Sequence, residues 1–175
     1  MANIFIIPGL GNSGPEHWQT WFEKQLPGAV RIDQKEWDAP ACEEWITGIN
    51  FALKDVDPGE VILVGHSLGC VTIAQWAQQS KFPVKGALLV APSDIESPVY
   101  EFPATGFTPI PLSPLPFPTI VVTSDDDHWV SLDRAKFFAE KWGSELVNIG
   151  KAGHINAVSG YGPWPEGIDI LKRLL

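Results

Sequence analysis

Residues 61–69 read VILVGHSLG, and this stretch decides the fold that we expect for the whole chain. Its first four residues form an apolar run typical of a buried strand, and residues 70–77 continue with helical spacing. A strand, a sharp turn and a helix therefore meet at Ser67. Such a turn strains the serine backbone and exposes its hydroxyl, while Gly65 and Gly69 let the strand and the helix approach closely. Although Gly-x-Ser-x-Gly also occurs by chance, this context makes Ser67 a candidate nucleophile.

The rest of the chain alternates short apolar runs with helical patterns. Strands are expected at residues 3–7, 29–32, 61–65, 86–91, 119–124 and 145–149. Helices are expected at residues 15–26, 41–56, 68–80, 132–142 and 165–175. Near-continuous apolar strands are typical of a parallel sheet that is covered on both faces. The pattern predicts one domain of the α/β class over residues 1–175, built as a three-layer α/β/α sandwich with right-handed crossovers.

One segment, residues 92–118, breaks this alternation. It holds eight prolines together with Tyr100, Phe102, Phe107 and Phe117. Proline at this density excludes regular helices and paired strands. A long loop inside a compact domain usually has a function, and this loop follows the carboxyl end of the fourth strand, where ligands bind in such sheets. We therefore expect a short, stiff cap over the site; the alternative is a plain surface crossover.

Composition restricts the compartment and the partners. The 175 residues carry a net charge of −9 without any basic cluster, which argues against nucleic acid and anionic membrane surfaces as partners. No apolar run is long enough to cross a bilayer, and no basic region precedes the apolar N-terminal stretch as it would in a signal peptide. The expected compartment is the cytoplasm. Cys42 and Cys70 lack metal-binding spacing and are expected to be free, buried thiols.

A serine nucleophile needs a base, an acid that orients the base, and donors for the oxyanion. In this architecture the chain order is serine, acid, histidine, each just past the end of a strand. Asp125, Asp126 and Asp127 follow the fifth strand. We assign the acid to Asp127, whose spacing to Val130 returns an apolar residue to the core, with Asp126 as the alternative. These adjacent carboxylates lack the ligand spacing of a calcium loop, and no metal is expected.

The base is expected to be His154, which lies in a glycine-containing loop after the last strand. Three other histidines compete with it. His17 lies at the first helix, and His128 stands beside the proposed acid. His66 directly precedes Ser67 and has to point away from its hydroxyl. An aspartate that holds the Nδ1–H of His154 leaves Nε2 free to accept the serine proton.

Two backbone N–H groups are the expected oxyanion donors. One belongs to Leu68, the residue after the nucleophile, and the other to Leu10 in the glycine-rich loop after the first strand, with Gly11 next. Residues 9–14 of this loop also spell the GxGxxG pattern of dinucleotide-binding proteins, and Asp33 follows about 20 residues later. That match stands alone beside a complete set of hydrolytic residues, so no cofactor is expected.

With these residues assembled, the chain resembles the small serine hydrolases of the YdeN and retinoblastoma-binding-protein-9 type, within the α/β-hydrolase superfamily. The matching segments span nearly the whole chain: residues 8–11, 17–18, 65–69, 115–118, 124–130, 153–156 and 159–167. The resemblance implies a triad of Ser67, Asp127 and His154. This chain differs from the family pattern at His128, because the family often has proline after the catalytic aspartate. We expect a six-stranded sheet in the order 2-1-3-4-5-6, with Leu10 and Ser67 on either side of one crevice.

The expected activity is that of an esterase-like serine hydrolase that forms an acyl-enzyme with a small or medium acyl substrate. Thioesters and amides share this machinery. Candidates for lining the substrate pocket are Gly11, His17, Trp18, Phe107 and Trp129. The alternative function is a catalytically weak binding protein on the same fold. The sequence contains no signal from which to infer an oligomeric state.

Overall fold

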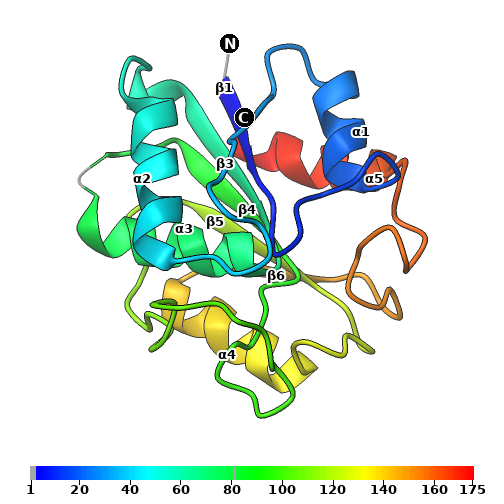
Figure 1. Ribbon diagram of the computed structural model, residues 1–175. Coiled ribbons are helices and arrows are strands. Elements are labelled where there is room, and N and C mark those ends of the chain that lie inside the picture. Colours follow the sequence, from blue (N-terminus) through cyan, green and yellow to red (C-terminus); the bar gives the residue numbers. More distant parts are fainter. Residues whose placement is uncertain (1–2, 81) are drawn as a thin grey trace.

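Six parallel strands form one sheet in the order β2-β1-β3-β4-β5-β6, as the sequence predicted (Figure 1). The structure, a computed structural model, describes residues 3–80 and 82–175; Met1, Ala2 and Lys81 of the expected domain lie outside the described residues. The strands are β1 (Asn3–Ile7), β2 (Val30–Arg31), β3 (Val61–His66), β4 (Gly86–Val90), β5 (Thr119–Thr123) and β6 (Glu145–Asn148). Each end of each strand lies within one residue of its expected position.

The described helices are α1 (Trp18–Gln25), α2 (Cys42–Leu53), α3 (Leu68–Gln79), α4 (Leu132–Trp142) and α5 (Pro165–Leu171), with short 3-10 turns η1 (Pro58–Glu60) and η2 (Lys172–Leu174). Helix α1 begins three residues later than expected because the side chain of His17 caps it by accepting the N–H of Gln19. Helix α2 stops three residues early, since Asp57 caps the separate turn η1 that Pro58 begins.

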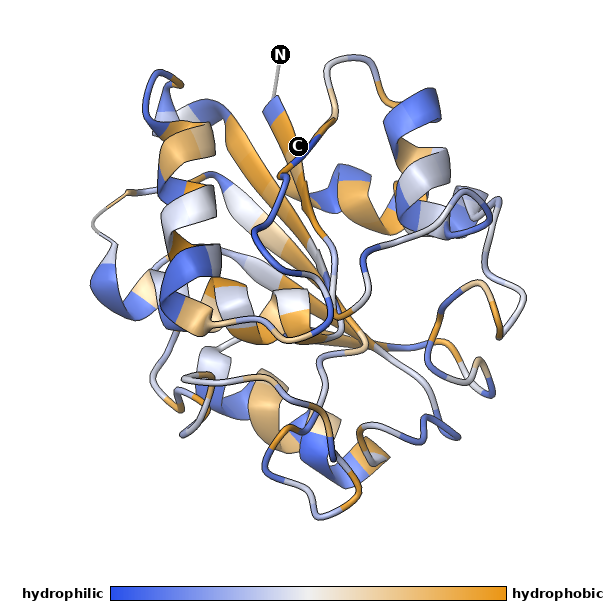
Figure 2. Cartoon of the chain, viewed as in Figure 1, coloured by the Kyte–Doolittle hydropathy of each residue, from blue (hydrophilic) through white to orange (hydrophobic). Residues whose placement is uncertain are grey.

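The strands divide their side chains between two cores. In β1, Ile4 and Ile6 pack with residues of α1 and α5, whereas Phe5 and Ile7 pack with residues of α2, α3 and α4. Figure 1 shows helices on both faces of the sheet, and Figure 2 shows hydrophobic strands between helices that carry both hydrophobic and hydrophilic residues. Every residue of β3, β4 and β5 is buried, which explains their continuous apolar sequences. This is the predicted three-layer α/β/α sandwich.

The turn between β3 and α3 fits against neighbouring backbone with no room for added side chains. A Cβ atom on Gly69 would overlap the carbonyl oxygen of Ile7, and one on Gly9 would lie 2.8 Å from the Cβ atom of Ser67. The backbone N–H of Ser67 donates to the carbonyl of Val90 at the end of β4 (3.0 Å). The ends of β1 and β4 therefore hold this turn at the carboxyl edge of the sheet.

Residues 92–118 are all described, and their sheet-type backbone pairing is limited to an isolated bridge between Thr105 and Ala41. This agrees with the density of proline. Phe107 and Phe117 are buried in the core, so much of the segment folds back onto the domain. Among the described residues, no helix combines the length and the apolar character needed to cross a bilayer.

Candidate active site

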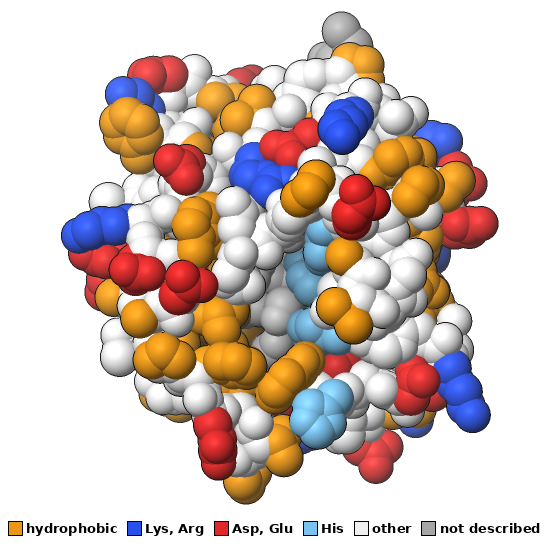
Figure 3. All heavy atoms as spheres, turned by 45° about the vertical axis from the view of Figure 1, so that its right-hand side comes forward, with side chains coloured by type: hydrophobic (Ala, Val, Ile, Leu, Met, Phe, Trp, Pro, Cys, Tyr) orange, Lys and Arg blue, Asp and Glu red, His pale blue; other side chains and the backbone are white. Residues whose placement is uncertain are grey.

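A pocket of about 260 Å³ opens at the carboxyl edge of the sheet. Its lining comes from the segments that follow β1, β3, β4, β5 and β6, which lie far apart in the sequence. Figure 3 shows histidine side chains inside a hollow on this face and hydrophobic side chains along part of its rim. In the described part of the chain, no Asp, Glu, Lys or Arg side chain lines the pocket.

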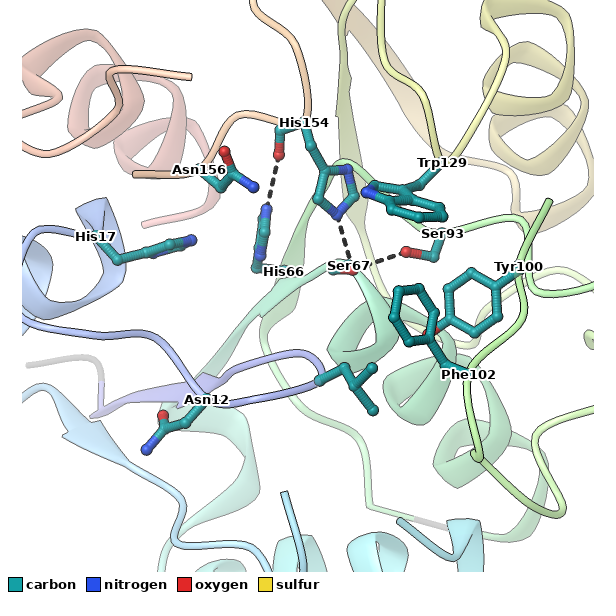
Figure 4. A pocket seen from close by; sticks show the side chains of 11 residues that line it. Asn12, His17, His66, Ser67, Ser93, Tyr100, Phe102, Trp129, His154 and Asn156 are labelled. Atoms are coloured by element: carbon teal, nitrogen blue, oxygen red, sulfur yellow. Dashed lines mark hydrogen bonds between the residues drawn. The ribbon is translucent and has the colours of Figure 1, made fainter. Parts of the chain in front are cut away.

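Ser67 occupies the sharp turn between β3 and α3, with backbone angles φ 56° and ψ −123°. Residues with side chains rarely adopt these angles, and the turn presents the serine to the pocket. The Oγ atom of Ser67 lies 2.8 Å from the Nε2 atom of His154 (Figure 4). The fold therefore brings these two predicted site residues, 87 positions apart in the chain, into direct contact.

The carboxylate of Asp127 contacts the other nitrogen of the His154 ring. Its Oδ2 and Oδ1 atoms lie 2.8 Å and 3.0 Å from Nδ1. The Asp127 side chain is fully buried, and the backbone N–H of Trp129 donates to its Oδ1 atom (2.8 Å). Because the carboxylate accepts, Nδ1 of a neutral ring carries the hydrogen, and Nε2 is left to accept the hydrogen of Ser67.

Asp126, the alternative acid, binds the loop that carries His154 rather than the ring itself. Its Oδ1 atom accepts hydrogen bonds from the N–H of Gly153 (2.8 Å) and from the hydroxyl of Ser124 (2.8 Å). These donors, the Gly153 N–H first, hold the pKa of Asp126 below its usual value. Asp125 turns instead toward the end of β6. The three adjacent aspartates thus have three different sets of partners.

The expected oxyanion donors are the backbone N–H groups of Leu68 and Leu10. Leu68 is the first residue of α3, where an N–H group has no acceptor within the helix. Leu10 lines the pocket, and its N–H has no hydrogen-bond partner in the described part of the chain. By contrast, the N–H of Gly11 donates to the carbonyl of Trp37 (2.8 Å). This difference favours Leu10 over Gly11 as a donor.

Ser93, which no sequence pattern singled out, also contacts Ser67. Its side chain is fully buried, and the two Oγ atoms lie 2.7 Å apart (Figure 4). When the single hydroxyl hydrogen of Ser67 points to His154, the hydroxyl of Ser93 has to be the donor in this pair. Asp94 anchors the loop by accepting two hydrogen bonds from Arg134 (2.8 Å and 3.0 Å). A hydroxyl residue just past the end of a strand was the available sequence signal.

The ring of His66 packs beside that of His154, with centroids 4.9 Å apart, and His17 packs against His66. The Nε2–H of His66 donates to the backbone carbonyl of His154 (2.9 Å), so the His66 ring points away from the hydroxyl of Ser67. The ring centroids of His17 and His66 lie 4.7 Å apart. Burial is the main cause that lowers the pKa of both rings, to about 3 for His17, where the charge of Arg31 adds to the effect. Both rings are therefore neutral at pH 7.

His17 and Trp129 line the pocket, but Trp18 does not, which corrects one expectation. Trp18 is completely buried and packs edge-to-face against Trp164. Its Nε1–H donates to the carbonyl of Ile155 (2.8 Å). Trp18 is thus a core residue, and its large ring supports the loop after β6 from behind the pocket.

Phe107 and Gly11 also lie outside the pocket. Phe107 is buried against Trp45, with ring centroids 5.7 Å apart, and Gly11 is exposed. Tyr100 and Phe102 line the pocket instead. Burial raises the pKa of Tyr100 to about 12, so its hydroxyl keeps its hydrogen at neutral pH. The aromatic content of this segment was visible in the sequence, but not which rings reach the site.

Comparison with known proteins shows the family to which the chain belongs. A family profile described as "Serine hydrolase" matches residues 4–173, so the chain belongs to the serine hydrolase family. It is similar to YdeN of Bacillus subtilis (strain 168), with 25% identity over 178 residues that cover 96% of this chain and 93% of YdeN. The resemblance to YdeN-type serine hydrolases is thereby confirmed.

Solved structures agree in fold. The crystal structure of a YdeN-like protein from Pectobacterium atrosepticum SCRI1043 has a TM-score of 0.88 and 36% identity, and the match covers 99% of this chain and 90% of that one. The crystal structure of the ydeN gene product from B. subtilis has a TM-score of 0.78 and 20% identity, with coverage of 99% and 98%.

Replacement of His17 by Asn tests the buried, neutral state of this ring. The pKa of His17 is about 3 in the folded protein, against an ordinary value of 6.5, so the unfolded chain binds more protons between these values. The free energy of unfolding therefore falls as pH drops through this window, by at most about 1.4 kcal/mol per pH unit for this ring. An Asn side chain keeps the helix cap but does not titrate.

Urea unfolding at pH 7 and pH 5 provides the measurement. His17→Asn should lose less stability than the wild type between these two conditions, by at most about 2 kcal/mol. An equal loss in the two proteins would contradict the lowered pKa.

Proposed function

We propose that the protein is an esterase-like serine hydrolase in which Ser67, His154 and Asp127 form a catalytic triad. The observation that supports this most is the continuous chain of hydrogen bonds from the serine hydroxyl through the histidine ring to the buried carboxylate. Membership of the serine hydrolase family agrees with this chemistry. The substrate class is a small or medium carboxylic ester, and thioesters and amides could be cleaved by the same steps.

In the proposed reaction, Oγ of Ser67 attacks the carbonyl carbon of the substrate while Nε2 of His154 takes the serine proton. The resulting imidazolium lies against the Asp127 carboxylate, which stabilises its charge and holds the ring in place. His154 then gives the proton to the leaving group, and an acyl-enzyme remains. Water attacks this ester with His154 again as the base, which releases the acid and restores Ser67.

The negative charge that develops on the substrate oxygen needs donors that are already in position. In our proposal these are the backbone N–H groups of Leu68 and Leu10. The N–H of Leu68 lies at the first turn of α3, where the helix dipole also favours negative charge. Leu10 belongs to the loop that packs against Ser67 through Gly9.

Ser93 has a supporting role in the proposed mechanism. Its hydroxyl donates to Oγ of Ser67 and so can stabilise negative charge on this oxygen as the proton leaves. The pair also limits rotation of the Ser67 side chain, which favours the orientation that faces His154. The pocket volume of about 260 Å³ supports a substrate of small or medium size.

A fluorophosphonate probe tests whether Ser67 is an activated nucleophile. The probe should add one covalent label to the wild type and none to Ser67→Ala, as intact-protein mass spectrometry would show. The exposed-site variant Ser113→Ala should be labelled like the wild type. A folded wild-type protein that stays unlabelled would refute the proposed activity and favour a binding protein on the same fold.

Separate replacement of the two candidate acids tests their assignment. Asp127→Asn should lower the kcat/KM of ester hydrolysis on the order of 10⁴-fold, because Nδ1 would lose its carboxylate partner. Asp126→Asn should lower it by less than about tenfold, since an amide oxygen can still accept from Gly153 and Ser124. Losses of similar size in the two variants would contradict the assignment to Asp127.

Replacement of Ser93 by Ala tests the hydroxyl pair. The rate of fluorophosphonate labelling at Ser67 should fall about tenfold, the size expected for one lost hydrogen bond to a reacting oxygen. Thermal unfolding of the same variant checks that the fold is kept. If labelling proceeds at the wild-type rate, Ser93 only fills space beside Ser67.

A further inference from the structure

The pocket has two chemically different sides around Ser67 (Figure 4). On one side, the rings of Tyr100, Phe102 and Trp129 pack edge-to-face against one another, with centroids 4.9 to 6.1 Å apart, and form an aromatic wall. On the other side lie His17 and Asn156. The proposed function uses neither of these polar side chains.

The hydrogen bonds of His17 determine which atom it can offer to a ligand. Its Nδ1 atom accepts the backbone N–H of Gln19 (3.1 Å) and so carries no hydrogen. With a pKa of about 3 the ring is neutral, and its single N–H is therefore at Nε2. In the described part of the chain this Nε2–H has no hydrogen-bond partner, and the atom is not enclosed by protein. His17 thus presents a donor.

Asn156 is oriented in the same way by its own neighbours. Its Oδ1 atom accepts both the backbone N–H of Ser159 (3.0 Å) and the hydroxyl of Ser159 (2.9 Å). The amide nitrogen is left without a partner among the described residues, and it too is accessible. Figure 4 shows this nitrogen and the tip of the His17 ring directed toward the same region beside His66.

This side of the pocket therefore offers N–H donors from two side chains, His17 and Asn156. The acceptor atom of each side chain is already engaged in hydrogen bonds within the protein. No charged side chain of the described residues lines the pocket, so nothing in the lining compensates a buried ammonium or carboxylate group. A neutral oxygen that accepts hydrogen bonds, such as the carbonyl of an amide, satisfies both donors without burying a charge.

We propose that His17 and Asn156 form a donor subsite that binds an uncharged carbonyl group of the substrate, separate from the carbonyl that Ser67 attacks. This proposal rests on the proposed hydrolase function. It predicts that the enzyme prefers esters that carry an apolar or aromatic group on one side of the cleaved bond and a neutral, carbonyl-bearing group on the other. Such a substrate complements the two sides of the pocket.

Two series of esters test the subsite. In the first, phenylacetate esters of short alcohols end in isopropyl, carboxamide, carboxylate or trimethylammonium groups; in the second, phenyl esters of short acids end in the same groups. In at least one series the carboxamide should exceed the isopropyl compound in kcat/KM by about tenfold, because two donors gain a partner. The carboxamide should also be preferred over both charged groups.

The variant Asn156→Asp provides the sharper test. An aspartate keeps an oxygen for Ser159 but replaces the N–H donor by a second acceptor. The ratio of kcat/KM between the carboxamide and trimethylammonium esters should fall about tenfold or more, and this ratio is independent of any general loss of activity. Asn50→Asp is the matched control: it adds the same charge at an exposed position of α2, and the ratio should stay at the wild-type value.

Failure of the subsite can be told apart from failure of the enzyme. If the isopropyl esters are cleaved but the carboxamide has no advantage in either series, the subsite is refuted while the hydrolase stands. A preference of the wild type for the carboxylate or the trimethylammonium ester would overturn the assignment to a neutral carbonyl. If no ester is cleaved and the fluorophosphonate does not react, the proposed function itself fails.

Discussion

The strained backbone of Ser67 is the constraint on which the rest of the site depends. Its φ of 56° and ψ of −123° cost about 1–3 kcal/mol and persist only when the surroundings compensate for them. The compensation is visible on both sides: Gly69 packs onto the backbone at the end of β1, and the N–H of Ser67 bonds to Val90 at the end of β4. A larger residue at position 69 would separate β1 from α3 and release the turn.

The contacts around His154 show how its loop is held in a fixed position, as a reacting side chain requires. Asp127 and Ser67 contact the ring, whereas the backbone of the loop is held by other groups. Asp126 binds the N–H of Gly153, and His66 binds the carbonyl of His154 itself. The ring is thus positioned by contacts that leave its two nitrogens free for their partners. Supporting interactions of this kind keep reacting groups within a fraction of an ångström of a productive geometry.

The pocket lining is uncharged in the described part of the chain. Burial keeps His17 and His66 neutral, and no charged side chain of the described residues lines the cavity. The Asp127 carboxylate lies just behind the lining, against His154. A positive charge that forms on His154 during the proposed reaction would therefore find its partner in Asp127, with neutral rings elsewhere around it. Neutral surroundings also leave the recognition of substrate to hydrogen-bond direction and to shape.

The sequence by itself determined the fold class, the strand order and the positions of most elements to within a few residues. These features follow from local signals: apolar runs of strand length, helical spacing, and the glycines around Ser67. It also led to His154, because a chain order and a strand end define where a base can stand. Helix ends were less well predicted where a side chain such as His17 sets the boundary.

Only the tertiary structure decided which side chains meet. Asp126 and Asp127 differ by one position, and the direction of a turn sends one to Gly153 and the other to the His154 ring. Ser93 becomes a partner of Ser67 because β3 and β4 are neighbours in the sheet. Trp18 is as large and apolar as the aromatic residues that line the pocket, but it lies on the face of α1 that packs into the core. Sequence patterns record which residues are apolar or reactive, whereas contacts across strand ends depend on the three-dimensional direction of each side chain.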